Sequence, residues 1–179
     1  MKSPVVPTWL GDSALLFPRP TKVSSGALQQ AAMAWPGVRD VVITADDVAV
    51  YFDPRHPPRD WASLPARLSE AAHTRVTPPR LHKCPVIYDG PDLNAFAAAC
   101  EMPVAEVIRR HSAAEYRVAM LGFLPGFAYL DGLDPRLIQP RRAAPRERIA
   151  PHSLAVGGPY TAVYPWPSPG GWHLLGRAL

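Results

Sequence analysis

The chain reads Gly122-Phe-Leu-Pro-Gly-Phe-Ala-Tyr-Leu130 in its second half, and later Tyr164-Pro-Trp-Pro-Ser-Pro-Gly-Gly-Trp172. Proline donates no backbone hydrogen bond and glycine readily adopts positive φ, so both stretches are typical of turns that bring the backbone close to a neighbour. Aromatic residues flank each turn, as they commonly do in small-ligand pockets. A single Pro-Gly pair can be only a hairpin connection, but two such turns around an arginine-rich segment favour a ligand cleft.

Arginine dominates the charge of the chain, with 16 Arg against three Lys and a formal net charge of +4. The one dense cluster comprises Arg136, Arg141, Arg142, Arg146 and Arg148. It is either a solvated loop or a fork for a carboxylate or phosphoryl oxygen, which a planar guanidinium can bind through two hydrogen bonds. Arg141 and Arg142 directly follow Pro140 and are the favoured ligands. Because the aromatic residues are not interleaved with arginines as a stacking platform, nucleic-acid binding is not predicted.

Length and composition indicate two small domains and no membrane segment. A chain of 179 residues exceeds the usual domain of roughly 100–150 residues, and its apolar runs are far shorter than the roughly 18–20 residues that cross a bilayer. The start, Met1-Lys-Ser-Pro-Val-Val-Pro7, lacks the apolar core of a signal peptide, so a cytoplasmic location is expected. Cys84 and Cys100 are expected to be free, buried thiols. No histidine near them is spaced as a ligand, so no metal site is predicted.

The first half of the chain has the periodicities of a small α/β sandwich. Strands are expected over residues 8–18, 38–43 and 48–52, and amphipathic helices over residues 22–35 and 58–72. One layer of helices would then cover one sheet. A first domain is therefore expected over residues 1–76, with a proline-containing linker over residues 75–81.

The second half changes to short strands between glycine and proline turns, in a domain expected over residues 82–179. Helices are expected over residues 92–100, with Asp92 as a possible cap, and over residues 103–111. Strands are expected over residues 83–88, 115–123, 154–156, 161–164 and 172–175. The pattern alone predicts a mostly β domain, either a barrel or a sandwich.

Several motifs follow one another in a specific order: Trp9-Leu-Gly-Asp-Ser, Cys84-Pro-Val-Ile-Tyr88, Tyr116-Arg-Val-Ala-Met-Leu-Gly-Phe-Leu-Pro-Gly-Phe, Pro140-Arg-Arg, Gly157-Gly and Ser168-Pro-Gly-Gly-Trp-His-Leu-Leu-Gly-Arg177. This order resembles the allophanate hydrolase subunit 1 family, which includes the B subunit of 5-oxoprolinase, Kip-type inhibitors of a sporulation histidine kinase, and a segment of urea carboxylase. The resemblance implies an α+β fold, with a small N-terminal α/β sandwich followed by a cyclophilin-like β-barrel. Family members run on beyond the position of Leu179. The barrel is therefore expected to be truncated at its C-terminal strands, and the isolated chain to aggregate or oligomerise.

The candidate site residues lie around these motifs. His111 ends a predicted helix five residues before Tyr116 and could act as a general acid or base, although an imidazole there can also satisfy the helix's terminal carbonyls. The family has a histidine at this position too. Tyr129 is the second catalytic candidate, because its phenol could support an oxyanion. Besides Arg141 and Arg142, the expected substrate-binding residues are Phe123, Phe127, Gly158, Tyr164 and Trp172.

The resemblance also implies a function and partners. It indicates the B subunit of a bacterial 5-oxoprolinase, an ATP-dependent amidohydrolase that opens 5-oxoproline to glutamate and is not expected to be active without partners. Those partners would be a C-type subunit of the allophanate hydrolase subunit 2 family and a third subunit. The sequence has no P-loop, serine-hydrolase elbow or dinucleotide motif, so ATP is expected to be bound by, or shared with, another subunit. The alternatives are a non-catalytic inhibitor of a sensor histidine kinase, and an allophanate or urea amidolyase subunit.

Overall fold

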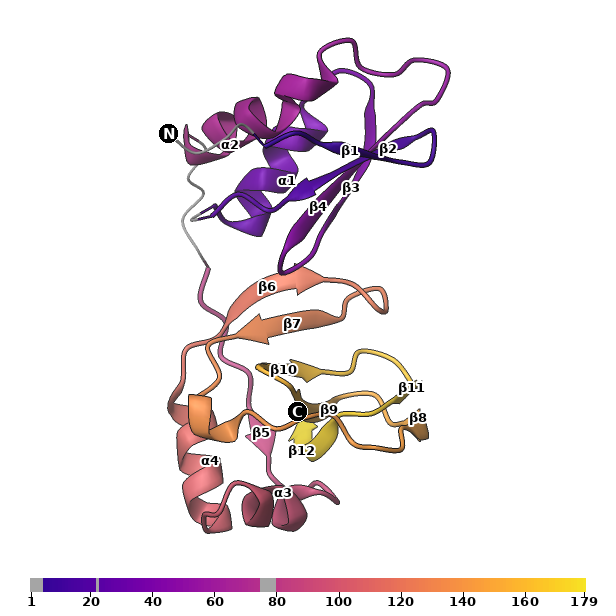
Figure 1. The fold of residues 1–179 in the computed structure, drawn as a ribbon. Helices are drawn as coiled ribbons and strands as arrows, with labels where there is room; N and C mark the ends of the chain where they lie inside the picture. Colours follow the sequence, from indigo (N-terminus) through magenta and orange to yellow (C-terminus); the bar gives the residue numbers. More distant parts are fainter. Residues whose placement is uncertain (1–4, 22, 75–79) are drawn as a thin grey trace. The chain divides into compact units, whose positions relative to one another are not determined.

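The computed structural model describes residues 5–21, 23–74 and 80–179. The chain forms two compact units, Met1–Arg80 and Leu81–Leu179 (Figure 1). Each unit has its own buried apolar residues. The expected linker over residues 75–81 falls largely on residues 75–79, outside the described part of the chain.

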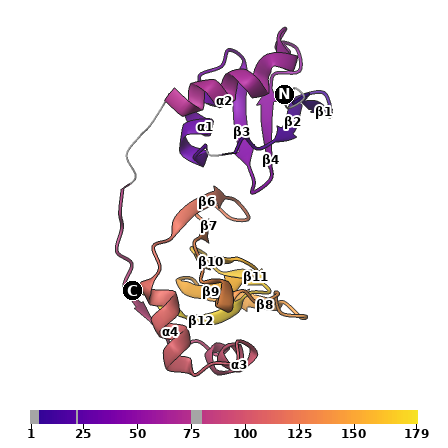
Figure 2. The same cartoon turned by 60° about the vertical axis from the view of Figure 1, so that its left-hand side comes forward.

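The first unit is a four-stranded antiparallel sheet in the order β1-β2-β4-β3, covered on one face by helices (Figures 1 and 2). The strands are β1 (Thr8–Leu10), β2 (Ala14–Pro18), β3 (Val38–Ile43) and β4 (Asp47–Phe52). The helices are α1 (Ser25–Met33) and α2 (Leu64–Thr74), and the short 3-10 helix η1 (Trp61–Ser63) leads into α2. The sandwich expected for the first half is the arrangement observed.

The packing of this unit follows from its sequence periodicity. In β4, Val48, Val50 and Phe52 alternate along the strand and are all buried in the core beneath the helices. Helix α1 begins where the Ser24 hydroxyl accepts a hydrogen bond from the Ala27 N–H at 3.2 Å, an N-cap that satisfies one otherwise unpaired donor. The segment expected as a strand over residues 8–18 forms β1 and β2, which are separated by the Gly-Asp-Ser turn at Gly11, where φ is +66°.

The second unit contains a six-stranded antiparallel sheet in the order β5-β12-β9-β10-β7-β6. Its strands are β5 (Val86–Ile87), β6 (Arg117–Leu121), β7 (Ala128–Asp131), β9 (Ser153–Gly157), β10 (Tyr160–Val163) and β12 (His173–Ala178). A second sheet pairs β8 (Arg146–Ile149) with β11 (Ser168–Gly170). Strands β5 and β6 are edges, so the described residues form an open sheet and not a closed barrel.

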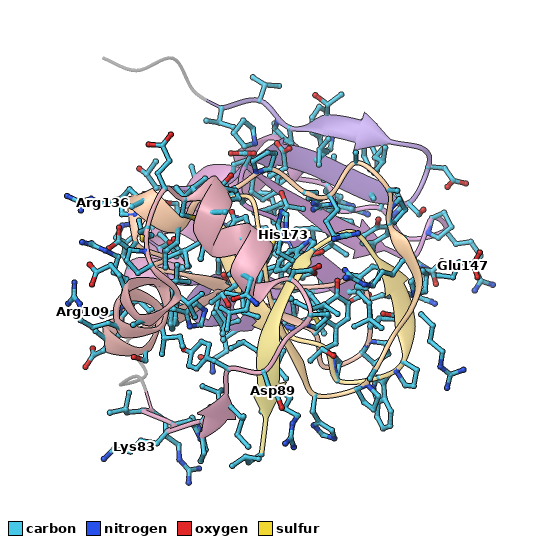
Figure 3. All side chains as sticks on the ribbon, turned by 90° about the horizontal axis from the view of Figure 1, so that it is seen from below. Lys83, Asp89, Arg109, Arg136, Glu147 and His173 are labelled. Carbon is cyan, nitrogen blue, oxygen red and sulfur yellow. The ribbon has the colours of Figure 1, made fainter. Side chains whose placement is uncertain are left out.

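Two helices lie together beside β5 and β12 at one side of this sheet (Figures 1 and 2). They are α3 (Leu93–Ala99) and α4 (Val104–Ala113), and the 3-10 helix η2 (Pro135–Leu137) follows β7. Phe96 of α3 and Val107 of α4 are fully buried against Val156 and Leu175 of the sheet. His173, labelled in Figure 3, lies beside helix α3, and its ring centroid is 5.3 Å from that of Phe96.

Several expectations for the second unit were wrong in detail. Strands β7, β8 and β11 were not expected, and the proline-glycine turn expected around Ser168 is instead β11, a strand with an irregular register opposite β8. Asp92 precedes α3, but its side chain makes no cap hydrogen bond. Helix α4 continues for two residues beyond His111. Cys84 is exposed and Cys100 is half-buried, so Cys84 is not the buried thiol that its apolar neighbours suggested.

Candidate functional site

The structure brings five of the expected site residues into one aromatic cluster in the second unit. Phe127 is buried at its centre, and its ring centroid lies 5.4 Å from Phe123, 4.9 Å from Tyr129, 5.2 Å from Tyr164 and 5.6 Å from Trp172. All four pairs meet edge to face, the arrangement that aromatic quadrupoles favour. Phe127 is therefore the core of the cluster, and the less buried rings around it are the ones that a ligand could reach.

Phe123 and Tyr129 are the accessible aromatic members of this cluster. Phe123 is 56% exposed and sits in the turn between β6 and β7 with φ +70°, a conformation that bulky residues rarely adopt. The turn is held by the Phe127 N–H, which donates to the Leu124 carbonyl at 3.0 Å. Trp166 supports it from outside, because its Nε1–H donates to the Pro125 carbonyl at 3.1 Å. The turn thus presents Phe123 to solvent beside the buried rings.

Two glycines allow the aromatic walls to pack closely. A Cβ at Gly157 would lie 2.6 Å from the indole of Trp172, and one at Gly170 would lie 2.4 Å from the hydroxyl of Tyr164. Both distances are shorter than any side chain can tolerate, so the strand backbones approach these rings directly. Gly158 follows with φ +61°, and its N–H donates to the Gln139 carbonyl at 2.8 Å. That N–H is therefore already engaged in this structure.

Arg141 lies over the face of Trp172, with its guanidinium carbon 5.9 Å from the ring centroid. It is exposed and forms no ion pair with a carboxylate of the described residues. Burial raises the pKa of Tyr164 to about 12, while the nearby Arg141 acts in the opposite direction. The Tyr164 phenol is consequently protonated at neutral pH, but its side chain is only 1% exposed and packs against Gly170, so it belongs to the buried wall of the cluster.

Arg142 and Arg146 are placed differently, because a buried carboxylate holds both. Asp92 accepts from Arg142 Nη1 at 2.9 Å and from the Arg146 guanidinium at 2.7 and 2.9 Å, and also from the Leu174 N–H at 2.7 Å. Burial opposes ionisation of Asp92, but the hydrogen bonds from Arg146 and the Leu174 N–H outweigh it and hold the pKa of this carboxyl below its usual range. The arginine-rich segment is thus anchored to α3 and β12.

His111 is buried in α4, and both of its ring nitrogens are hydrogen-bonded. Nδ1 lies 2.8 Å from the Tyr88 hydroxyl, and Nε2 lies 2.9 Å from the Thr161 hydroxyl, which itself donates to the Ala155 carbonyl at 3.0 Å. Because the Thr161 hydroxyl uses its proton on Ala155, its oxygen accepts from His111 Nε2–H. His111 Nδ1 is then unprotonated and accepts from the Tyr88 hydroxyl. Burial lowers the pKa of His111 to about 4. A neutral, fully bonded imidazole ties α4 to β10, and its role in proton transfer stays a prediction.

The arrangement can bind a small anion beside an apolar surface. Arg141 supplies the cation, the phenol of the half-buried Tyr129 supplies a neutral donor, and the exposed ring of Phe123 supplies apolar surface. The described residues contain no group of three His, Cys, Asp or Glu side chains that could hold a metal ion. Within the same residues, no helix is long and apolar enough to cross a membrane.

No local sequence pattern pointed to several residues that shape this region. Tyr88 and Thr161 lie far from His111 along the chain, and only the fold brings them to its two nitrogens. Asp92 was expected to cap α3, but it binds arginines about 50 residues away. The Ser168 hydroxyl is buried in β11 and has no hydrogen-bond partner within the described part of the chain.

Comparison with known proteins places these features in a wider group. The family described as "Carboxyltransferase domain, subdomain C and D" matches residues 8–179. The B subunit of 5-oxoprolinase from Escherichia coli O157:H7 is 46% identical over 101 residues, which cover 55% of this chain and 46% of that protein. The B subunit of 5-oxoprolinase from Bacillus subtilis (strain 168) is 33% identical over 191 residues, which cover 94% of this chain and 80% of that protein.

A solved structure has a similar fold. The crystal structure of TTHA0988 superposes with a TM-score of 0.77 at 35% identity, covering 93% of this chain and 35% of that one. The matched part therefore amounts to about half the length of the E. coli relative and about a third of TTHA0988.

Proposed function

The chain belongs to the carboxyltransferase domain, subdomain C and D family, and on this premise we propose that it is the B subunit of a 5-oxoprolinase. The family match confirms the resemblance drawn from the motifs. Two relatives above 30% identity are named as the B subunit of 5-oxoprolinase, and a name of this form implies partner subunits. The proposed reaction is the ATP-dependent opening of the 5-oxoproline lactam to glutamate. The proposed partners are a C-type subunit and a third subunit, which would bind ATP or share it.

One observation carries the assignment of the substrate site: Arg141 is the member of the arginine pair that is not held by Asp92. 5-Oxoproline has a carboxylate that must be held and a ring carbonyl that gains negative charge when the lactam opens. Arg141 would bind the carboxylate through two charge-assisted hydrogen bonds. The phenol of Tyr129 would face the developing oxyanion as a neutral donor, Tyr164 would support the wall behind it, and Phe123 would cover the ring.

The other expected site residues take supporting roles in this proposal. Arg142 and Asp92 would position the segment that carries Arg141, since Arg142 is anchored by both its side chain and its N–H, which donates to the Gly171 carbonyl at 2.7 Å. His111 would position α4 against the sheet, because it is buried and both of its ring nitrogens are already engaged in hydrogen bonds. The cyclophilin-like barrel expected for residues 82–179 likewise remains a proposal, since the sheet of the described residues is open.

Reconstitution of the complex tests this function. The full protein is co-expressed with its C-type and third subunits, and glutamate formation from 5-oxoproline is followed with and without ATP. The proposal predicts turnover that needs ATP and that disappears when this chain is omitted. Turnover of equal rate without this chain, or turnover of allophanate but not of 5-oxoproline, would contradict it.

A further inference from the structure

A hollow of about 460 Å³ lies in the first unit, formed wholly by that unit and separate from the aromatic cluster. Trp35 and the turn after it form one side, the loop from His56 to Asp60 forms another, and Arg67 of α2 forms a third. Its volume falls within the range of small-molecule sites, which is roughly 300–1,000 Å³, and the hollow is open to solvent on one side. Neither the motifs nor the proposed function uses this hollow.

Rigid backbone shapes its walls. Gly37 has φ +83°, and a Cβ there would lie 3.8 Å from the His56 carbonyl, so the turn after α1 and the loop after β4 are close neighbours. Pro57 and Pro58 fix φ along that loop. The His56 N–H donates to the Asp53 carbonyl at 2.8 Å, which anchors the start of the loop. A ligand would therefore meet walls that are largely preformed.

Arg67 is held in a position suited to an anion. Its guanidinium carbon lies 4.6 Å from the centroid of the Trp35 ring, within the distance of a cation–π contact. A guanidinium that stacks through its face keeps its N–H donors in its plane, where a carboxylate can accept two of them. Trp35 is packed partly against the core, so it gives Arg67 a firm support.

The cations of this hollow lack carboxylate partners. In the described ranges 5–21, 23–74 and 80–179, neither Arg59 nor Arg67 forms an ion pair, and Asp60 is the one acidic residue of the lining. Asp53 is not available to them, because it already binds Arg39 and Arg55.

A second hollow, beside α4, provides the contrast. It has a volume of about 390 Å³ and is also lined by two arginines, Arg109 and Arg110. There, Glu106 binds both arginines and Asp134 binds Arg110, each at 2.7 Å. Those two arginines are paired with neighbouring carboxylates, whereas among the described residues Arg59 and Arg67 form no ion pair, and Asp60 is the one negative charge in their lining.

We propose that the hollow at Trp35 and Arg67 is a binding site for a small carboxylate anion. Arg67 donates two parallel hydrogen bonds to the carboxylate, Arg59 adds positive charge, and the prolines cover the apolar part of the ligand. This site lies beyond the proposed oxoprolinase function, and neither proposal depends on the other.

Nuclear magnetic resonance on the full chain tests the site, with glutarate as the probe at constant ionic strength and neutral pH. The Trp35 indole N–H, identified from the spectrum of Trp35→Phe, and the Arg67 Nε–H are followed during the titration. Both signals are expected to shift and then saturate. In Arg67→Gln the affinity should fall by about tenfold or more, the cost of losing a charge-assisted hydrogen bond. Arg67→Lys keeps the positive charge but loses the paired N–H donors of the guanidinium. Its affinity for glutarate should lie between those of the wild type and Arg67→Gln.

Arg136→Gln is the matched control for loss of one positive charge, because Arg136 projects outward from the second unit (Figure 3). It should leave the titration unchanged. If Arg67→Gln does not fold, Arg59→Gln replaces it and should also weaken binding. The proposal would be overturned if the two signals shifted linearly with glutarate concentration and chloride caused the same shifts. Equal affinity for glutarate in the arginine variants and the wild type would also overturn it.

Discussion

Asp92 determines which arginines of the second unit are free. Its carboxylate, with the side chain only 6% exposed, accepts hydrogen bonds from Arg142, Arg146 and the Leu174 N–H. Removing one partner of a buried ion pair leaves charges without compensation, and this is more costly than the net contribution of the pair. The local geometry of this carboxylate therefore controls both the stability of the unit and the reach of its arginines.

Asp92→Asn is expected to lower the free energy of unfolding of the second unit by about 3 kcal/mol, because Arg142 and Arg146 keep their charges and lose their counter-ion. Asp89→Asn is the matched control: Asp89 forms an exposed ion pair with Arg177 at 2.9 Å, and such pairs contribute about 0–1 kcal/mol. Urea denaturation measures both. Equal, small losses in the two variants would show that the Asp92 cluster is not an anchor.

His111 gives the second unit a pH dependence with a defined sign. Burial lowers its pKa from 6.5 to about 4 in the folded protein, so between these values the unfolded chain binds a proton that the folded chain does not. The contribution of His111 to the free energy of unfolding is therefore fully present above pH 6.5. It is lost as the pH drops towards 4, by about 3 kcal/mol in all. The pKa of Asp92 is also lowered, from 3.8, so the stability that its carboxylate contributes is lost only at pH values below this range.

The measurement compares urea unfolding at pH 7 and pH 4.5. His111→Gln should keep much of its stability at low pH relative to its own value at neutral pH, since it has no imidazole to protonate. His173→Gln removes a half-buried imidazole whose Nε2 lies 2.9 Å from the Pro140 carbonyl, and serves as the control for loss of a histidine elsewhere in the same unit. An unchanged pH dependence in His111→Gln would rule out this explanation.

At the residue level, the sequence predicted the aromatic cluster but not the division of roles among the arginines. The Pro-Gly turn at Phe127 was readable because turn chemistry depends on neighbouring residues, whereas the turn expected before Trp172 is strand β11. The difference between Arg141 and Arg142 depends on Asp92, a residue about 50 positions away that packs against them only in the folded state. No local pattern carries that information.

At the scale of elements, close approach between β9 and Trp172 explains why a glycine stands in the strand. Gly157→Ala would place a methyl group 2.6 Å from the indole and should destabilise the second unit by about 1–3 kcal/mol, the usual cost of overpacking. Gly122→Ala is the control, because nothing lies within 4 Å of its Cβ position and its φ is not in the positive region. Thermal unfolding compares the two. Equal stability in both variants would mean that β9 moves away at little cost.

The edge strand β6 is the element most prone to pair with another chain. Among the strands that the structure describes, it pairs with β7 alone, and the exposed apolar residues Val118 and Leu121 lie on it, with Phe123 just beyond. An unpaired apolar edge is a template for further strands, so the chain is expected to self-associate at micromolar concentrations. Leu121→Lys should restore a monomer, while Ile138→Lys, at another exposed apolar position, should not. Light scattering decides between these outcomes, and a monomeric wild-type chain would refute the expectation.

Long, periodic elements were predictable, and short strands were not. Helices α1 and α4 and the β3–β4 hairpin followed from apolar spacing. Strands β7, β8 and β11 have three or four residues each, and β11 contains Pro169. The pairing of β8 with β11 joins segments about 20 residues apart, and a proline in a strand is tolerated only where its missing N–H is not needed.

At the scale of the whole molecule, the chain is two units with separate cores. The buried apolar cluster of the first unit runs from Leu15 to Ala72, and those of the second unit lie between Leu93 and Leu175. The mixed α and β composition and the N-terminal sandwich were predictable, because each half has its own periodicity. Closure of a barrel was not, because it depends on how edge strands such as β5 and β6 are covered.

Measuring how strongly the assembled complex depends on Arg141 for binding 5-oxoproline tests the proposed function most directly. In the reconstituted complex, Arg141→Gln should raise the KM for 5-oxoproline by about tenfold or more, because a charge-assisted fork to the carboxylate is lost. Its unfolding should match the wild type, whereas Arg142→Gln should unfold more easily, since it breaks the contact with Asp92. An unchanged KM in Arg141→Gln, in a complex that turns over 5-oxoproline at the wild-type rate, would contradict the account.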